Sequence, residues 1–330
     1  MKPILRILLV LFSVGMIFAG GAREARAAGS PIEFAIPVET KRTVDAIALI
    51  HRDDTAKLLP VEGNLKRATV NPSGGKIAYV IRDGDHLKVY LCDPNGQNKK
   101  LAEDYKSEER NFQDFVDIRF IKGGRILLIA RFLKNEISFI EYDMQKGKPR
   151  FINKLEWQGP PTSTYRIDSY NGGTLVYAKN SNQGSHILQQ VWMVGAYAGK
   201  FALFLELEAP PSILDMVPDL KNKRIFASGT ATRHLSAKNT IKNLMLVDSI
   251  KKQPKNLTDD PLFLNMTMSD DGNSIAWVSS TYQNGIKFKR YKINSGKVVE
   301  IVPEGQKARD KGQASVGSIV PSQPADSKGK

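Results

Sequence analysis

Five short apolar runs recur along the chain at nearly constant spacing. They begin at Ile77, Ile126, Leu175, Ile225 and Ile275, so consecutive runs start 49, 49, 50 and 50 residues apart. A strand with one face in water alternates apolar and polar side chains, whereas a strand covered on both faces is apolar throughout. Because these runs are continuously apolar, we predict that each is a strand in the middle of a sheet that is packed on both sides.

The same surroundings accompany each run, which makes it part of a repeated unit. A second strand-like segment follows, at 89–93, 139–143, 191–194, 244–248 and 288–293. Eight residues before each run lies a β-branched residue that predicts an earlier, innermost strand: Thr69, Ile118, Ile167, Val217 and Thr267. Glycine stands in the turn before four of the runs, where a tight hairpin needs a positive φ. In the fourth unit the sequence at 221–223 is KNK instead.

Four strands per unit, repeated radially, predict an all-β fold that is a single β-propeller with about 50 residues per blade. Five complete units occupy residues 62–303, and weaker strand signals at 33–38, 46–50 and 56–61 indicate an atypical first blade. We therefore expect six blades, closed by a blade that both chain ends share so that no sheet edge is exposed. A five-bladed ring with an accessory N-terminal segment, or a β-sandwich with accidental spacing, is the alternative.

Both ends of the chain differ in composition from the repeats. Lys2 and Arg6 precede an apolar stretch at 7–19, and small residues follow at Ala25 and Ala27. This is the pattern of a secretory signal peptide, and the stretch is shorter than the roughly 20 residues that span a bilayer. Residues 304–330 contain no aromatic residue and many lysines, glycines and serines, which predicts a disordered tail. The expected division is a signal peptide at 1–27, a propeller at 28–303 and a tail at 304–330, with no membrane span after cleavage.

Two segments resemble a known repeat. The sequence NPSGGKIAYV at 71–80, followed by Val89 to Asp93 and Gly96, resembles a TolB-type propeller repeat, and so does MSDDGNSIAWV at 268–278. The resemblance implies a periplasmic propeller of the kind found in TolB and in the N-terminal halves of prolyl-oligopeptidase-family enzymes. No segment resembles the α/β domain that precedes the propeller in TolB or the hydrolase domain of the oligopeptidases. The resemblance therefore implies a propeller fold, a periplasmic location and a role as a binding or scaffold module.

Several familiar chemistries lack their motifs in this sequence. There is no G-x-S-x-G elbow, P-loop, C-x-x-C or H-E-x-x-H pattern, and the four histidines are widely scattered. The single cysteine, Cys92, cannot form an intramolecular disulfide and sits in a strand-like segment. Short Asp- and Gly-containing turns do not have the EF-hand spacing. We expect no catalytic residue, no metal and no cofactor.

Four charged residues lie on the predicted innermost strands. Asp117 and Arg119 stand nine and seven residues before one apolar run, and Arg166 and Asp168 stand at the same offsets before the next. Innermost strands border the channel of a propeller, so these side chains are expected to line it. An inter-blade ion-pair set and a channel ligand site both remain open.

The segment at 157–165, WQGPPTSTY, is a candidate partner surface. Trp157 and Tyr165 flank a Pro-Pro pair, and aromatic side chains on a rigid loop are typical of interaction hot spots. A packed crossing between blades is the other reading of the same segment.

The net charge of the chain and its predicted export limit the classes of partner that it is expected to bind. The formal net charge is +14, which is consistent with binding to an anionic envelope surface or an acidic protein partner, and equally with a solvated basic surface that binds nothing. Export and the lack of a basic-aromatic module argue against nucleic acid. We expect a monomeric, periplasmic or secreted propeller that binds envelope proteins without catalysis. The alternative is a propeller enzyme, a lactonase or lyase with a metal or ligand at the channel.

The signal-peptide pattern predicts cleavage after Ala27 or Ala28 during export, because small residues stand there. N-terminal sequencing of the secreted protein measures this directly. A mature chain that retains residues 7–19 would contradict it and would favour a membrane anchor.

Overall fold

The computed structural model describes most of the chain between residues 31 and 304. The described ranges are 31–41, 44–107, 114–133, 136–156, 165–168, 173–183, 186–208, 212–230, 242–248, 254–260, 264–280 and 285–304. The predicted signal peptide and all of the predicted tail after Glu304 lie outside these ranges.

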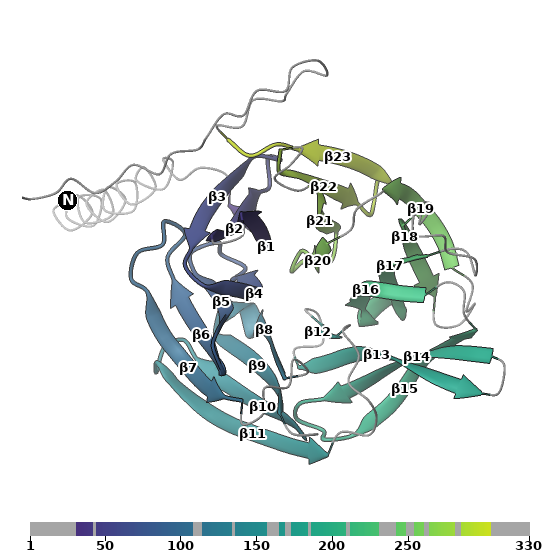
Figure 1. Ribbon diagram of the computed structural model, residues 1–330, viewed down its shortest axis with the longest axis horizontal. Helices are drawn as coiled ribbons and strands as arrows, with labels where there is room; N and C mark the ends of the chain where they lie inside the picture. Colours follow the sequence, from purple (N-terminus) through teal and green to yellow (C-terminus); the bar gives the residue numbers. More distant parts are fainter. Residues whose placement is uncertain are drawn as a thin grey trace, which may run out of the picture.

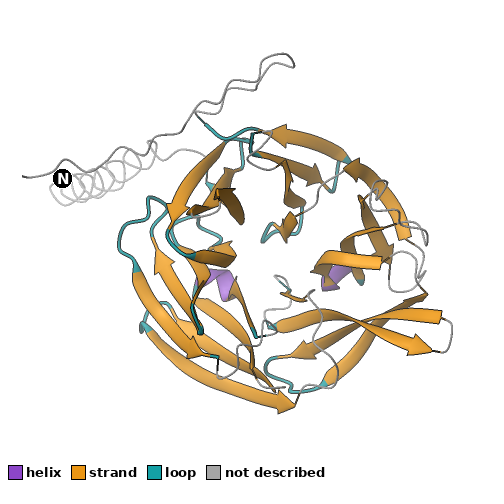
Figure 2. Ribbon diagram, in the orientation of Figure 1, coloured by secondary structure: helices purple, strands orange, loops and turns teal. Residues whose placement is uncertain are grey.

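The described residues form six antiparallel sheets arranged radially around a central axis, the blades of a propeller (Figure 1). Strands account for nearly all the regular structure, and the two helical segments are short 3₁₀ turns at Lys122–Gly124 and Leu220–Asn222 (Figure 2). The prediction of an all-β propeller with six blades is confirmed.

The first three blades are built from consecutive segments of the chain. Blade 1 contains β1 (Ile32–Lys41), β2 (Val44–His51) and β3 (Ala56–Val61). Blade 2 contains β4 (Asn64–Val70), β5 (Ile77–Asp83), β6 (His86–Cys92) and β7 (Lys100–Lys106). Blade 3 contains β8 (Phe115–Ile121), β9 (Ile126–Leu133), β10 (Glu136–Asp143) and β11 (Lys148–Glu156).

The other three blades continue the same order from the axis outward. Blade 4 contains β12 (Tyr165–Ile167), β13 (Thr174–Gln183), β14 (His186–Gly195) and β15 (Phe201–Glu208). Blade 5 contains β16 (Ser212–Asp219), β17 (Arg224–Thr230), β18 (Lys242–Asp248) and β19 (Pro254–Asp260). Blade 6 contains β20 (Leu264–Met268), β21 (Ser274–Ser280), β22 (Lys287–Lys292) and β23 (Lys297–Ile301).

The apolar runs are the second strands of blades 2 to 6, and their two faces pack against different neighbours. In β9, Leu128 and Ala130 face blade 4, whereas Leu127 and Ile129 face blade 2. The other second strands divide in the same way, for example Tyr177 and Val176 in β13. The runs are continuously apolar because neither face of a blade is left in water.

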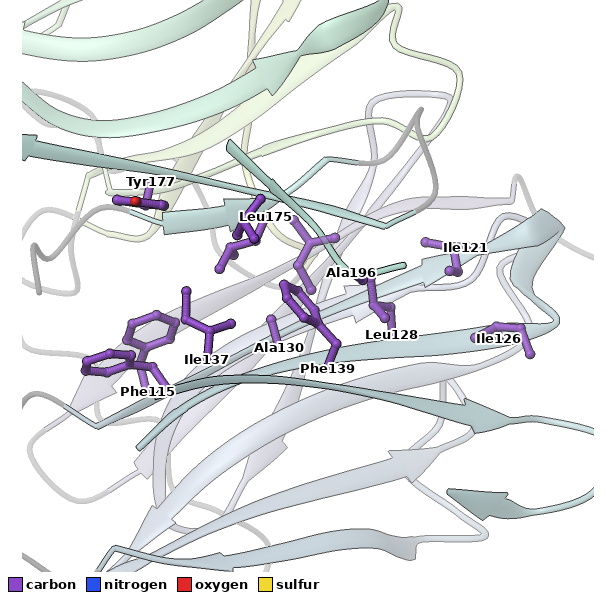
Figure 3. Close-up of a cluster of buried hydrophobic side chains, with 13 residues drawn as sticks. Phe115, Ile121, Ile126, Leu128, Ala130, Ile137, Phe139, Leu175, Tyr177 and Ala196 are labelled. Atoms are coloured by element: carbon purple, nitrogen blue, oxygen red, sulfur yellow. The ribbon is translucent and has the colours of Figure 1, made fainter. Parts of the chain in front are cut away.

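The hydrophobic core is therefore divided among the interfaces between blades. Six clusters of buried side chains are described, one for each pair of neighbouring blades including blades 6 and 1. Figure 3 shows the cluster between blades 3 and 4, where Phe115, Ile137 and Phe139 of blade 3 lie opposite Leu175 and Tyr177 of blade 4.

Blade 1 differs from the others in strand number and in direction. Its inner strand β1 begins beside the turn that follows β4, since a Cβ on Gly74 would lie 3.1 Å from the nitrogen of Ile32. It ends near the start of β4, where the N–H of Leu65 donates to Asp45, a residue that pairs with Glu39 of β1. The inner strand of blade 1 thus runs antiparallel to the inner strand of blade 2.

Blades 1 and 6 meet where the ring closes. Among the described residues, blade 1 comes entirely from the N-terminal part and blade 6 entirely from the C-terminal part. A blade shared by both chain ends stays a prediction, because the residues after Glu304 lie outside the described ranges. The two blades pack through an apolar interface that includes Phe34, Ile36 and Phe288, all fully buried. After β23 the N–H of Glu304 donates to the carbonyl of Ala56 at 2.8 Å, which ties the C-terminal segment to blade 1.

Two adjacent glycines allow a prediction about the turn after β8. Gly124 has φ of 85°, and a Cβ there would lie 2.9 Å from Cδ of Pro72 in the neighbouring blade. Gly123 has φ of 66° with nothing within 4 Å of its Cβ position. Gly123→Ala should therefore cost about 1 kcal/mol of unfolding free energy from backbone strain, and Gly124→Ala about 2–3 kcal/mol from strain plus the clash. Denaturant unfolding of both variants measures the difference, and equal costs would show that the blades do not approach this closely.

Candidate functional site: the central channel and its mouth

Neighbouring blades are joined near the axis by a repeated hydrogen bond. In each case a side-chain oxygen of one blade accepts from a backbone N–H of the inner strand in the next blade. The donors and acceptors are Leu65 to Asp45 (2.6 Å), Ile167 to Asp117 (2.7 Å), Ile213 to Gln189 (2.7 Å) and Met266 to Asp215 (3.1 Å). Three of the donors lie at register shifts of the inner strands, where a bulge directs an N–H out of the ladder.

Three arginines of the inner strands form ion pairs with carboxylates of other blades. Arg67 Nε lies 3.3 Å from Asp117 of blade 3, and Arg166 lies 2.8 Å from Asp215 of blade 5. All four side chains are at most 18% exposed. Ion pairs of this burial cost desolvation, and they are tolerated where every charge has a partner.

Arg119 reaches across the axis of the ring. Its guanidinium, from blade 3, donates to the carbonyl of Met268 at 2.8 Å and to Asp270 at 2.7 Å, both in blade 6. Blades 3 and 6 lie opposite each other in a ring of six (Figure 1). The arginine therefore blocks the channel from one wall to the other.

Little space remains in the channel itself. The cavity bordered by Ala35, Arg67, Asp117, Ile118 and Met266 has a volume of about 40 Å³. That volume admits a few water molecules, each of which needs roughly 10–15 Å³ on this measure. The channel interior is therefore a structural plug of paired charges.

The four charged residues predicted from the sequence lie on or beside the inner strands. Asp117, Arg119 and Arg166 line the channel cavity. Asp168 directly follows β12 and is 1% exposed. The structure therefore brings three of them to the channel wall, and the described partners of these three are Arg67, Asp215 and Asp270.

Of the two aromatic residues predicted to form a partner surface, Trp157 and Tyr165, the structure describes only Tyr165. Trp157 lies outside the described residues. Tyr165 is half-buried between blades, where its ring stacks on Phe115 and the Arg67 guanidinium lies 4.8 Å from the ring centroid. Tyr165 therefore has an inter-blade packing role in this structure.

One mouth of the channel opens into a larger recess of about 330 Å³. It is lined by the start of β1, by the residue that follows β2, by the end of β8 and by the residues that follow β4, β8 and β20. These parts meet on one face because β1 is reversed. Its polar lining residues are Glu33, Arg52, Asn71, Lys122, Ser269, Asp270 and Asp271.

The recess presents both signs of charge. Glu33 is buried against Arg290 at 2.5 Å, and burial raises the pKa of its carboxyl despite that arginine. Burial likewise raises the pKa of Asp270, while Arg119 beside it acts in the opposite direction. Arg52 is exposed, and within the described part of the chain its guanidinium has no ion-pair partner. The concave surface thus contains an exposed guanidinium that acts electrostatically on the Glu33 and Asp271 carboxylates without forming a close ion pair with either.

Lys122 is held at the rim of the recess by a buried carboxylate. Its ammonium lies 3.1 Å from Glu141, which also accepts from Arg150 and from the Tyr197 hydroxyl of blade 4. Burial alone would raise the pKa of Glu141, but these hydrogen bonds lower it to about 2. The rim is therefore rigid and ionised at neutral pH.

The sequence reading missed the recess, although part of it carries a signal. Asn71, Lys122 and Asp270 all stand four to six residues before an apolar run, in the turns after the inner strands. Because these turns are equivalent in the repeat, their alignment predicts that the three side chains lie on the same face of the propeller. Glu33 and Arg52 come from blade 1, whose apolar run at 46–50 does not follow the spacing of 49 or 50 residues and therefore gives no position to align.

Comparisons with known structures agree with the propeller fold. The crystal structure of TolB from Acinetobacter baumannii is similar over 83% of this chain and 64% of that chain, with a TM-score of 0.56 and 13% identity. A nidogen/laminin complex is similar over 82% of this chain and 93% of that chain, with a TM-score of 0.51 and 9% identity. The fold is a TolB-type propeller. The chain spans about two thirds of the length of the TolB structure, and identities this low concern the fold alone.

Sequence comparisons add no relative: no protein-family model matches the chain, and no curated protein matches it. Within the described ranges, no helix is long and apolar enough to cross a membrane. The same residues include no group of three or more His, Cys, Asp or Glu side chains placed to hold a metal ion.

The ion pair between Arg166 and Asp215 is open to a direct test. Arg166→Ala leaves a mostly buried carboxylate without its cation, so the unfolding free energy should fall by about 3–5 kcal/mol. Adding Asp215→Ala should recover part of the loss, because residues in contact are not additive. The matched double variant with Asp117→Ala should recover none, because Asp117 bonds to Arg67 and Ile167. Denaturant unfolding decides, and a cost below about 1 kcal/mol for Arg166→Ala would contradict a structural role.

Proposed function

We propose that this protein is an exported, periplasmic binding module that holds a segment of another envelope protein at the mouth of its channel and catalyses no reaction. The observation that carries the proposal is the contrast between the two spaces on the axis. The channel is plugged by paired charges around about 40 Å³, whereas the mouth is an open recess of about 330 Å³.

The recess suits a polypeptide that carries charges of both signs. Arg52 offers an exposed guanidinium for a carboxylate of the partner, and arginine forms forked hydrogen bonds with carboxylates. Asp270 and Asp271 lie in the same recess and can receive a lysine or arginine of the partner. A partner must place an acidic group opposite Arg52 and a basic group opposite Asp270 and Asp271. This requirement favours specific binding.

The rigidity of the rim supports a preformed site. Lys122 is fixed by Glu141, and Asp270 is fixed by Arg119 from the opposite blade. A site that is ordered before binding loses little conformational entropy when the partner docks. The basic and apolar N-terminal pattern of the sequence supports export to the compartment where such a partner would be met.

One observation favours the second candidate, a propeller enzyme acting at the same mouth. The raised pKa of the Asp270 carboxyl is a property of general acids, which need a pKa closer to neutrality than that of a free carboxyl. An enzyme would convert its ligand, whereas a binding module would release it unchanged, so recovery of the intact ligand separates the two.

The proposal predicts that Arg52→Glu weakens partner binding. Mature protein immobilised on a support should capture one envelope protein, and the charge reversal should lower its affinity by about tenfold, or about 1.4 kcal/mol. Lys57→Glu, an equal charge change on the exposed outer strand of blade 1, is the matched control and should leave the affinity within about twofold. Unchanged affinity for the Arg52 variant, or an equal loss for both variants, would contradict binding at the mouth.

A further inference from the structure

A second open groove, of about 500 Å³, lies between the outer part of blade 4 and the first turn of blade 5. It shares no lining residue with the channel mouth. Its apolar lining comes from Met193, Ala202, Leu203, Phe204 and Leu220. Leu203 is 46% exposed, which makes it one of the few large apolar side chains in water among the described residues.

Two lysines provide all the charge of this groove. Lys200, in the turn between β14 and β15, and Lys223, at the end of the 3₁₀ turn of blade 5, line it, and no carboxylate does. Both are exposed, and neither has an ion-pair partner in the part of the chain that the structure describes. The groove is therefore an apolar surface with two unneutralised positive charges.

The backbone at Lys223 departs from the repeat in a way that places this side chain. Lys223 has φ of 52°, whereas the corresponding turns of blades 2 and 6 use glycine at positive φ, Gly74 and Gly272. A left-handed conformation is unfavourable for a residue with a side chain, because the Cβ atom comes close to the following carbonyl oxygen. Among the lysines that the structure describes, Lys122, which lines the mouth recess, also has a positive φ. Strained residues that persist despite their cost concentrate at binding sites.

The turn that contains Lys223 is held in place by a buried aspartate at its start. Asp219, 4% exposed, accepts from Arg224 Nε at 2.7 Å and from the Asn222 amide at 2.9 Å. The opposite wall contains a bulge, because the register of β14 and β15 shifts between Val191 and Trp192, so that Phe204 is the extra residue. Blades 2, 3 and 5 have the same shift between their two outer strands, so this bulge is part of the repeat. A bulge redirects side chains at functional edges, and here it sets Leu203 and Phe204 along the groove.

We propose that this groove is a docking site for an extended peptide segment of a partner protein in which apolar residues alternate with acidic ones. Charge complementarity carries the argument: two free ammonium groups flank an apolar floor that contains no carboxylate. β15 is the outermost strand of blade 4, so one of its edges is open for an added strand. Alternation suits the site because successive side chains of an extended peptide point to opposite sides.

The test uses the full mature chain and a fluorescein-labelled octapeptide of alternating leucine and glutamate. Fluorescence anisotropy should show saturable binding at least tenfold tighter than that of the octapeptide of alternating leucine and lysine. Lys200→Glu with Lys223→Glu should weaken binding at least tenfold. Lys57→Glu with Lys297→Glu, an equal charge change at exposed sites outside the groove, should leave it within twofold. Absence of saturable binding, or an equal loss in both double variants, would overturn the proposal.

Four further variants separate docking in the groove from effects on folding and from non-specific apolar binding. Lys223→Gly relieves the positive φ, so it should leave the melting temperature unchanged or higher while weakening binding. Leu203→Ser should also weaken binding, whereas Val298→Ser, which removes an apolar side chain 40% exposed on blade 6, should not. Arg52→Glu must leave octapeptide binding unchanged, which keeps this site distinct from the channel mouth. Displacement of the octapeptide by micromolar laurate would reassign the groove to a lipid and overturn the peptide proposal.

Discussion

The burial of both faces of every blade is the constraint on which the rest of this structure depends. A sheet with two apolar faces cannot stand alone in water, because each face needs another sheet against it. Six such sheets satisfy one another only if the last packs against the first. The cluster that contains Phe34 and Phe288 does this for blades 1 and 6, so the ring closes through side-chain packing. Stability is therefore shared around the ring.

The same closure brings six inner strands together at the axis, where polar groups replace apolar packing. Four inner-strand N–H groups, three of them at bulges, donate hydrogen bonds to side chains of the preceding blade, namely Asp45, Asp117, Gln189 and Asp215. Arginines then neutralise two of these carboxylates, and Arg119 joins opposite blades. The polar centre satisfies backbone groups that would otherwise be buried without partners. It also fills the channel and leaves the concave polar surface at the mouth.

Departures from the repeat coincide with the two surfaces proposed for binding. The reversed inner strand of blade 1 places Glu33 and Arg52 at the mouth beside Asp270, which a regular first blade would not do. At the outer groove the departure is the left-handed Lys223 of blade 5, where blades 2 and 6 have a glycine with positive φ, whereas the bulge at Phe204 recurs in blades 2, 3 and 5. A repeated fold supplies the frame, and local exceptions that cost stability supply the candidates for recognition.

The sequence by itself determined the propeller, because a spacing of 49 or 50 residues between doubly buried strands is a local property that each unit carries separately. It also placed Asp117, Arg119 and Arg166 on inner strands, since their offsets from the apolar runs are visible in one dimension. It did not determine that Arg166 pairs with Asp215 or that Arg119 reaches Asp270, 151 positions away. Those partners follow from the angle between blades and from ring closure. The direction of β1, the recess it helps to form and the groove beside Lys223 were likewise decided only in the tertiary structure, because each depends on how one blade meets another.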